Sequence, residues 1–204
     1  MRFTHLHPVH TAILGGLLCL SLNASAESMT DREQAAKKVS AEFLQRLSGE
    51  LKKEISANGP VAAISVCRDI APRIANDLSI EHGWKITRVS KKARNPMLGT
   101  PDAWENRKLD EFEIRAANGA KPADLHTDQI VREGDKSYYR CMSPIAVQPI
   151  CLTCHGSDTD IPAEVKARID ELYPHDMARG YKVGDIRGAV SIKQPLAIEL
   201  PGAE

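Results

Sequence analysis

The segment 151–155, which reads Cys-Leu-Thr-Cys-His, carries the clearest chemical signal in this sequence. Two cysteines and a histidine at this spacing form the pattern with which haem is attached covalently to a polypeptide. Each thiol adds to one of two vinyl groups on the same macrocycle, and the histidine that follows offers a ring nitrogen to the iron. The motif therefore predicts one covalent haem c, attached through Cys151 and Cys154, with His155 as an iron ligand.

Two other uses of a Cys-x-x-Cys pair are a structural zinc site and a thiol–disulfide redox site. Structural zinc usually takes a second pair of ligands at similar spacing, whereas Cys67 and Cys141 each stand alone. A redox-active pair would begin a helix inside a thioredoxin-like β-α-β pattern, which the flanking sequence does not show. Haem is therefore the favoured interpretation of the motif.

Residues 1–26 have the pattern of a cleaved secretory signal peptide. Arg2 supplies a positive start, residues 12–22 are uncharged and apolar, and Ala24-Ser25-Ala26 forms a small-x-small cleavage site. The apolar run is about half of the roughly 20 residues that a membrane-spanning helix needs. We therefore expect a periplasmic protein without a stable membrane anchor, with residues 27–204 forming a single domain. Haem attachment of the c type takes place outside the cytoplasm, in agreement with export.

Composition narrows the classes of partner. Lys+Arg and Asp+Glu balance at 27 each, so the chain lacks the basic excess that neutralises phosphates, and a nucleic-acid partner is not expected. Hydrophobic residues make up 42% of the chain but aromatic residues only 4%. A large flat apolar cofactor would supply part of the bulk that so few aromatic side chains provide.

Cys67 and Cys141 remain once haem attachment and signal cleavage are accounted for. An oxidising compartment disfavours free thiols, so both cysteines need an explanation. Cys67 lies on the apolar side of a predicted helix, where it is either a small buried hydrophobe or a thiolate bound to iron opposite His155. Cys141 is a buried passenger, a disulfide partner of Cys67 or a rival ligand, and the first interpretation is favoured.

Methionine and histidine side chains elsewhere are weaker candidates for the iron. Methionine more often fills gaps in a core, and the two histidines lie in polar stretches where we expect them to be exposed. These candidates are Met97, Met142, Met177, His126 and His175.

The elements that position these residues follow from hydrophobic periodicity and turn signals. A capping box of Thr30 and Glu33 should start a long helix, which Asn58-Gly59-Pro60 should end. A second helix should follow from 61 to 78, with a bend or restart at Pro72. Further expected elements are a strand over 84–90, a helix from Thr100, strands on both sides of 133–135, a short helix over 162–172 and a closing hairpin over 181–192. Helices followed by hairpin-linked strands indicate an α+β fold with an antiparallel sheet.

Four segments in fixed order resemble one known family. They are residues 61–75, 86–105, 150–156 and 181–192. Together they are similar to the bacterial PAS-like c-type haem domain family, long classed as a domain of unknown function and also found as the sensor domain of histidine kinases and chemoreceptors. The resemblance covers nearly all of the mature chain. It implies a PAS-like antiparallel sheet flanked by helices, and iron ligation by His155 and Cys67.

Arg88 and Arg94 flank a loop that this resemblance marks. Haem carries carboxylates, and arginine can bind a carboxylate through paired hydrogen bonds. Both are therefore candidate cofactor-binding residues, although solvation explains a surface arginine equally well. Arg140 is a weaker candidate of the same kind.

The predicted ligands bear on function. A thiolate stabilises ferric iron, so a His/Cys pair should give a lower reduction potential than a His/Met pair. We expect an electron carrier that exchanges electrons with a partner protein. The first alternative is a haem-based redox or gas sensor, which in the family often relies on an attached signalling domain and here would signal through a separate partner. The second alternative is a haem redox enzyme, which needs an open iron position and an acid–base group beside it. A bound Cys67 would block that position, so no catalytic residue is assigned.

Overall fold

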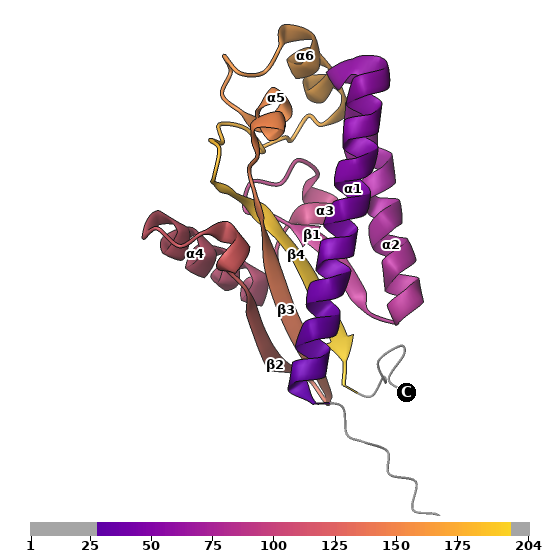
Figure 1. Cartoon of the computed structure of the whole chain (residues 1–204), viewed down its shortest axis with the longest axis vertical. Coiled ribbons are helices and arrows are strands. Elements are labelled where there is room, and N and C mark those ends of the chain that lie inside the picture. Colours follow the sequence, from indigo (N-terminus) through magenta and orange to yellow (C-terminus); the bar gives the residue numbers. More distant parts are fainter. Residues whose placement is uncertain (1–27, 197–204) are drawn as a thin grey trace, which may run out of the picture.

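The structure is a computed structural model and describes residues 28–196 (Figure 1). The predicted signal peptide, residues 1–26, lies outside the described residues. In chain order the elements are α1 (Met29–Ser65), the π-helical turn η1 (Val66–Ile70), α2 (Ala71–His82), β1 (Lys85–Val89), α3 (Pro96–Gly99), α4 (Ala103–Ala117), η2 (Pro122–Asp124), β2 (Thr127–Glu133), β3 (Lys136–Ala146), η3 (Pro149–Cys151), α5 (Leu152–His155), α6 (Ala163–Leu172) and β4 (Ile186–Pro195).

The strands form one antiparallel sheet in the order β1-β4-β3-β2. β2 and β3 make a hairpin through a turn at Gly134, and β4 inserts between β1 and β3. Glycine at position 188 permits this close approach, because a Cβ there would lie 2.2 Å from the carbonyl oxygen of Val89. The predicted α+β class, with a PAS-like antiparallel sheet and a long N-terminal helix, is confirmed.

The predicted closing hairpin of residues 181–192 is wrong in its first half. β4 is present, but residues 181–183 form no strand. The N–H of Tyr181 instead donates to the carbonyl of His155 at 3.0 Å, and that of Gly184 donates to the carbonyl of Val147 at 3.0 Å. A short alternating run does not distinguish a strand from an extended connection whose hydrogen bonds go elsewhere.

Helix α1 is a helical hairpin. Its backbone reverses at Gly59, with φ 82° and ψ 175°, and Pro60 opens the second arm. The second arm continues through η1 into α2, which lies beside the first arm (Figure 1). The predicted stop at Asn58-Gly59-Pro60 is confirmed. The start differs from the prediction, because Ser28 and Asp31 rather than Thr30 and Glu33 form the capping box.

An irregular turn interrupts the second arm of this hairpin. Residues Val66–Ile70 are π-helical, and Pro72 follows in the first turn of α2. The restart expected at Pro72 is present, because α2 begins at Ala71 directly after the π turn. Cys67 lies inside this π turn, a rare conformation that is frequent at functional sites.

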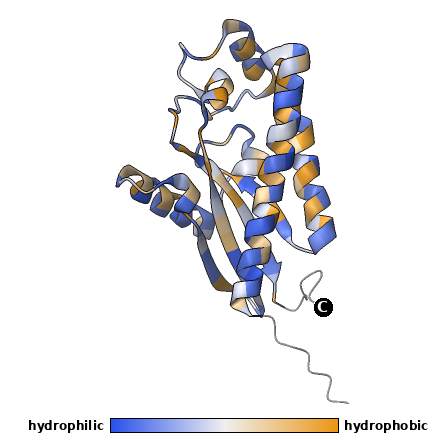
Figure 2. Cartoon of the chain, viewed as in Figure 1, coloured by the Kyte–Doolittle hydropathy of each residue, from blue (hydrophilic) through white to orange (hydrophobic). Residues whose placement is uncertain are grey.

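Both faces of the sheet are packed, and Figure 2 shows hydrophobic residues along β3, β4 and α2. Under α1 and α2 the core contains Phe43, Leu47, Leu78, Trp84, Ile86, Tyr139, Cys141, Val190 and Ile192. Under α4 it contains Trp104, Leu109, Phe112, Met142, Ile186 and Ala189.

Asp102 caps α4 through the N–H groups of Trp104 and Glu105, so the helix begins after the predicted Thr100. Within residues 28–196, no helix has the length and apolarity to cross a membrane.

Candidate haem-binding site

The Cys-x-x-Cys-His segment forms one compact helical turn. η3 ends at Cys151 and α5 covers Leu152–His155 directly after it. Both thiols and the imidazole therefore come from five successive residues of helical chain. Cys151 and Cys154 are half-buried and form no disulfide. Burial raises the pKa of the Cys154 thiol to about 11. Gly156 closes the turn, and a Cβ there would lie 2.5 Å from the Cβ of Asp160, so the segment tolerates no larger residue.

His155 is held by a main-chain oxygen. Its Nδ1 lies 2.7 Å from the carbonyl oxygen of Ala178. A carbonyl can only accept, so this contact places the proton on Nδ1 and leaves the lone pair on Nε2. Burial, with the charges of Arg187 and Arg94, lowers the pKa of His155 well below its usual value. The ring is therefore neutral at pH 7 and offers one defined nitrogen to a metal.

The segment 176–181 fixes the end of the motif through its main chain. The N–H of Gly180 donates to the carbonyl of Gly156 at 2.7 Å, next to the bond from Tyr181 to His155. The Tyr181 ring also meets the imidazole edge-on, with 6.4 Å between the ring centroids. The orientation of His155 is thus set by contacts on both its backbone and its ring.

Arg94 ties the same segment to the motif. Its Nη2 donates to the carbonyl of Cys154 at 2.6 Å, and its Nε donates to the carboxylate of Asp176 at 3.1 Å. Both side chains are buried, with exposed fractions of 9% and 2%. Burial acts to raise the pKa of Asp176, but the charge of Arg94 and hydrogen bonds to the carboxylate outweigh it and lower the pKa. Arg94 therefore positions the motif; its predicted contact with a haem carboxylate stays a prediction.

Cys67 reaches the motif from a distant part of the sequence. Burial is the main cause of the raised pKa values of Cys154 and Tyr173. The Cys67 thiol is close enough to add to the rise at each of them. Cys154 also packs against a cluster that joins the second arm of α1 to α6, formed by Ile64, Ile161, Val165, Ile169 and Tyr173. Cys67 is half-buried and forms no disulfide with Cys141, which is fully buried in β3. Of this pair, only Cys67 is among the groups that act on the pKa of Cys154.

Arg187 is the functional candidate that the sequence reasoning missed. Its Nη1 donates to the hydroxyl of Ser90 at 2.9 Å and to the carbonyl of Lys92 at 3.2 Å. Within the described part of the chain, its Nε is buried without a hydrogen-bond partner, and no carboxylate pairs with it. Burial, with the charges of Arg88 and Arg94, lowers its pKa to about 10, although Tyr181 and Cys67 oppose the change. The sequence offered one signal for this role: Arg187 is a charged residue at the start of the apolar run 186–192.

The residues present fit a haem. Arg187 is a half-buried cation with a buried, unused donor, and an anionic partner such as a haem carboxylate would satisfy it. Arg88 is half-buried and acts on the pKa of His155 and of Arg187, so three arginines lie within electrostatic reach of the imidazole. Covalent attachment requires two thiols on one turn, and iron ligation requires a neutral imidazole with Nε2 free. Carboxylate binding requires nearby cations. The site provides all three.

The remaining candidates lie elsewhere. Arg140 is buried under α4, where it pairs with Asp102 at 2.7 Å and Glu105 at 3.1 Å and stacks on the Trp104 ring, so it is not part of the site. Met142 is fully buried in the core under α4, whereas Met97, Met177 and His175 are exposed. The expectation that His126 is exposed is wrong, because it is half-buried between α1 and the start of β2.

The fold and the site together define a member of a c-type haem domain family. Among solved structures, the chain is similar to one described as the crystal structure of the cyanobacterial heme-protein Tll0287, with 26% identity and a TM-score of 0.59 over 81% of this chain and 93% of that one. The sequence model of the Tll0287-like family matches residues 19–195, and the chain belongs to this family. It is therefore a haem-binding domain. No curated protein matches the chain.

Proposed function

We propose that this protein is an electron carrier with one haem, bound covalently through Cys151 and Cys154 and ligated by His155 and Cys67. The observation that carries the proposal is the electrostatic coupling of Cys67, in the π turn, to Cys154 in the motif turn, together with the packing of Cys154 against the cluster that contains Ile64 of α1. Arg187, Arg94 and Arg88 act on the pKa of His155, and Cys67 acts on that of Arg187. Bound haem supplies an iron centre that takes up and releases one electron.

The chain's own groups define how such a centre would be held. The Ala178 carbonyl keeps Nε2 of His155 as the free nitrogen, and Arg94 keeps the motif turn in place. Arg187 and Arg88 provide positive charge for carboxylates. With histidine on one side and a thiolate on the other, the iron would be six-coordinate and its potential low, because a thiolate stabilises the ferric state.

Electron transfer is supported over catalysis by the groups beside His155. The side chains whose charges act on this histidine are Arg187, Arg94 and Arg88. Arginine stays protonated in proteins, so it neither donates nor accepts a proton in general acid–base catalysis. A site with this surround suits the exchange of electrons with a second redox protein.

Intact-mass and spectroscopic measurements test this function. The chain would be produced in the periplasm of a host whose control cytochrome matures. We expect a mass increase of one haem that survives denaturation, and a low-spin ferric electron paramagnetic resonance spectrum with thiolate character. A bare polypeptide mass would reject covalent attachment, and a high-spin ferric spectrum would reject the second ligand.

Export is a separate part of the proposal. It is supported by the signal-like residues 1–26 and by the extracytoplasmic site of c-type haem attachment. N-terminal sequencing of the mature protein should begin at Glu27, and the haem should appear in the periplasmic fraction. A retained Met1 with the haem in the cytoplasm would contradict export.

A redox or gas sensor is the second candidate, favoured by the position of Cys67 in a π turn. Such a turn contains one residue more than an α-helical turn, so a local change of register would move Cys67 relative to α5. Carbon monoxide separates the two functions. Rapid binding to the reduced protein supports a sensor whose sixth ligand leaves, whereas slow or absent binding supports the carrier.

A further inference from the structure

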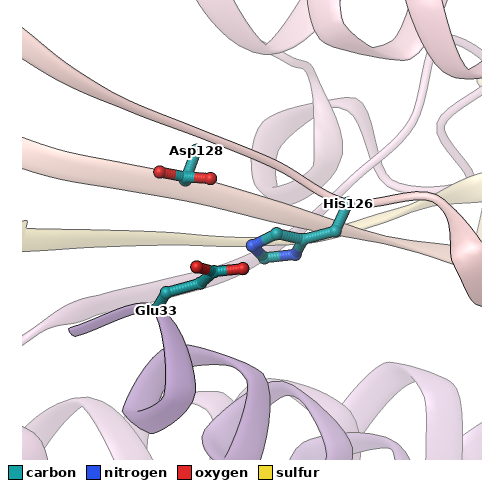
Figure 3. A group of neighbouring side chains, drawn as sticks. All are labelled: Glu33, His126 and Asp128. Carbon is teal, nitrogen blue, oxygen red and sulfur yellow. The ribbon is translucent and has the colours of Figure 1, made fainter. Parts of the chain in front are cut away.

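Glu33, His126 and Asp128 form a cluster of metal-binding side chains separate from the haem site (Figure 3). One ligand atom from each lies within 4.8 Å of the other two. Atoms bound to one zinc ion at about 2.1 Å lie roughly 3.4 Å apart. Small side-chain rotations would therefore close the cluster around an ion, and the partly exposed carboxylates permit them.

The fold places these side chains on one face. His126 directly precedes the edge strand β2 and Asp128 is its second residue, so the two side chains, two positions apart in extended chain, point to the same side of the sheet. Asp128 pairs with Cys141, which belongs to the core under α1, and the first turns of α1 bring Glu33 over the same edge. In Figure 3 the imidazole extends toward the space between the two carboxylates.

Buried polar atoms without partners are the second, independent observation. Nε2 of His126 is shut off from solvent and, within residues 28–196, has no hydrogen-bond partner, while its Nδ1 lies 3.4 Å from the Ser143 hydroxyl. The hydroxyl of Tyr139, a residue only 1% exposed, makes no well-aligned hydrogen bond there either, but it lies near Asp128, and burial together with this carboxylate raises the pKa of the phenol. Tyr139 is the diagonal neighbour of Asp128 in the β2–β3 ladder. Buried polar groups of this kind usually meet an ion or water.

The donor set selects the class of ion. One imidazole nitrogen with two carboxylates suits zinc and similar transition metals, whereas calcium and magnesium prefer oxygen alone. Lys37 pairs with Glu33, so a bound cation would compete with this ammonium group for the carboxylate.

We propose that Glu33, His126 and Asp128 form a second metal site, which binds one divalent cation of the zinc type and links α1 to the edge strand β2. A water molecule bound to the ion would contact the Tyr139 hydroxyl. The proposal does not depend on the ligands of the haem. Its site is built from the first turns of α1, β2 and β3, whereas the haem candidates lie in η1, α5 and the residues around β4.

Equilibrium dialysis of the haem-loaded protein against Zn²⁺, followed by metal analysis, tests the site. We expect one zinc per chain, and at least tenfold weaker binding in His126→Ala. His175→Ala is the matched control, because His175 is exposed and outside the cluster, and it should bind like the wild type. Equal zinc binding by the wild type and His126→Ala, or an equal loss in His175→Ala, would overturn the proposal.

A second variant guards against a folding effect at position 126. Asp128→Asn retains the shape of an exposed side chain but removes one anionic ligand. It should also weaken zinc binding at least tenfold, and zinc should raise the unfolding temperature of the wild type only. Unchanged zinc affinity in Asp128→Asn would contradict the site even if His126→Ala failed to fold.

Discussion

Cys67 and Cys141 are both free cysteines outside the haem motif, but the regions around them are built differently. Cys67 is half-buried in a π turn and acts on the pKa of Arg187, which has a buried donor without a partner among the described residues. Cys141 is completely buried in the middle of β3, within the apolar core under α1. Among the described residues, the first region contains a charged donor without a partner, whereas the second is filled by its own apolar side chains.

This difference shows that burial and neighbouring charge, rather than residue type, assign a role to each cysteine. In the region of Cys67, stability should depend on ion pairs and on the bound cofactor. In the region of Cys141, it should depend on apolar packing. Substitutions in each region test this distinction.

The largest expected effect is at the iron. Cys67→Ala should convert a low-spin ferric spectrum to a high-spin one, because the proposed sixth ligand is removed. Cys141→Ala is the matched control and should leave the spectrum unchanged. Absorption and electron paramagnetic resonance spectra of both ferric proteins provide the measurement. A low-spin spectrum in Cys67→Ala would remove this residue from the iron.

The next effect concerns the ion pair that holds the motif. Asp176→Asn leaves the buried Arg94 without its anionic partner and should cost about 3 kcal/mol in unfolding free energy. Asp170→Asn, which alters an exposed carboxylate, should cost less than about 1 kcal/mol. Denaturant unfolding of the two variants measures the difference. Equal losses would show that burial of the pair contributes little.

The same pair predicts a dependence on pH. The pKa of Asp176 is lowered from 3.8 in the folded protein, so the unfolded chain binds this proton more tightly. The contribution of Asp176 is therefore fully present above about pH 5 and is lost as pH falls through the folded pKa. The stability difference between wild type and Asp176→Asn should shrink below pH 4, measured by urea unfolding at several pH values. A difference that grows on acidification would contradict the sign.

Arg187→Gln should change the redox properties with less effect on the fold. A unit charge about 10 Å from a redox centre contributes about 1.7 kcal/mol at an effective dielectric constant of about 20, or roughly 70 mV for one electron. Loss of the cation favours ferric iron, so the potential should fall by tens of millivolts. Spectroelectrochemical titration measures it, and Arg115→Gln, in the last turn of α4, should have no effect.

The smallest effect is expected in the sheet. Cys141→Ala removes one buried sulfur atom from a packed core and should cost about 1 kcal/mol in unfolding free energy. Thermal unfolding should show this loss together with a full haem complement. A loss of haem in this variant would mean that the two regions are coupled more tightly than their packing indicates.

The sequence predicted what neighbouring residues determine. Gly59-Pro60 produces the helical reversal, the turn at Gly134 produces the β2–β3 hairpin, and the motif forms one turn, because each signal acts within a few residues. Arg187 and Asp176 were missed, since their roles arise from contacts with residues about 80 to 100 positions away. The placement of Cys67 beside the motif followed from family resemblance, because helical periodicity alone left burial and ligation open.

The hydrogen bond from His155 to the Ala178 carbonyl has a consequence for how this centre can vary. The acceptor belongs to the main chain, so no side-chain replacement at position 178 deletes it. Amino-acid substitutions at position 178 should therefore leave the imidazole tautomer unchanged, whereas a one-residue insertion or deletion between Asp176 and Gly180 would disturb it. Chain length in this short connection, more than its composition, is the inherited constraint.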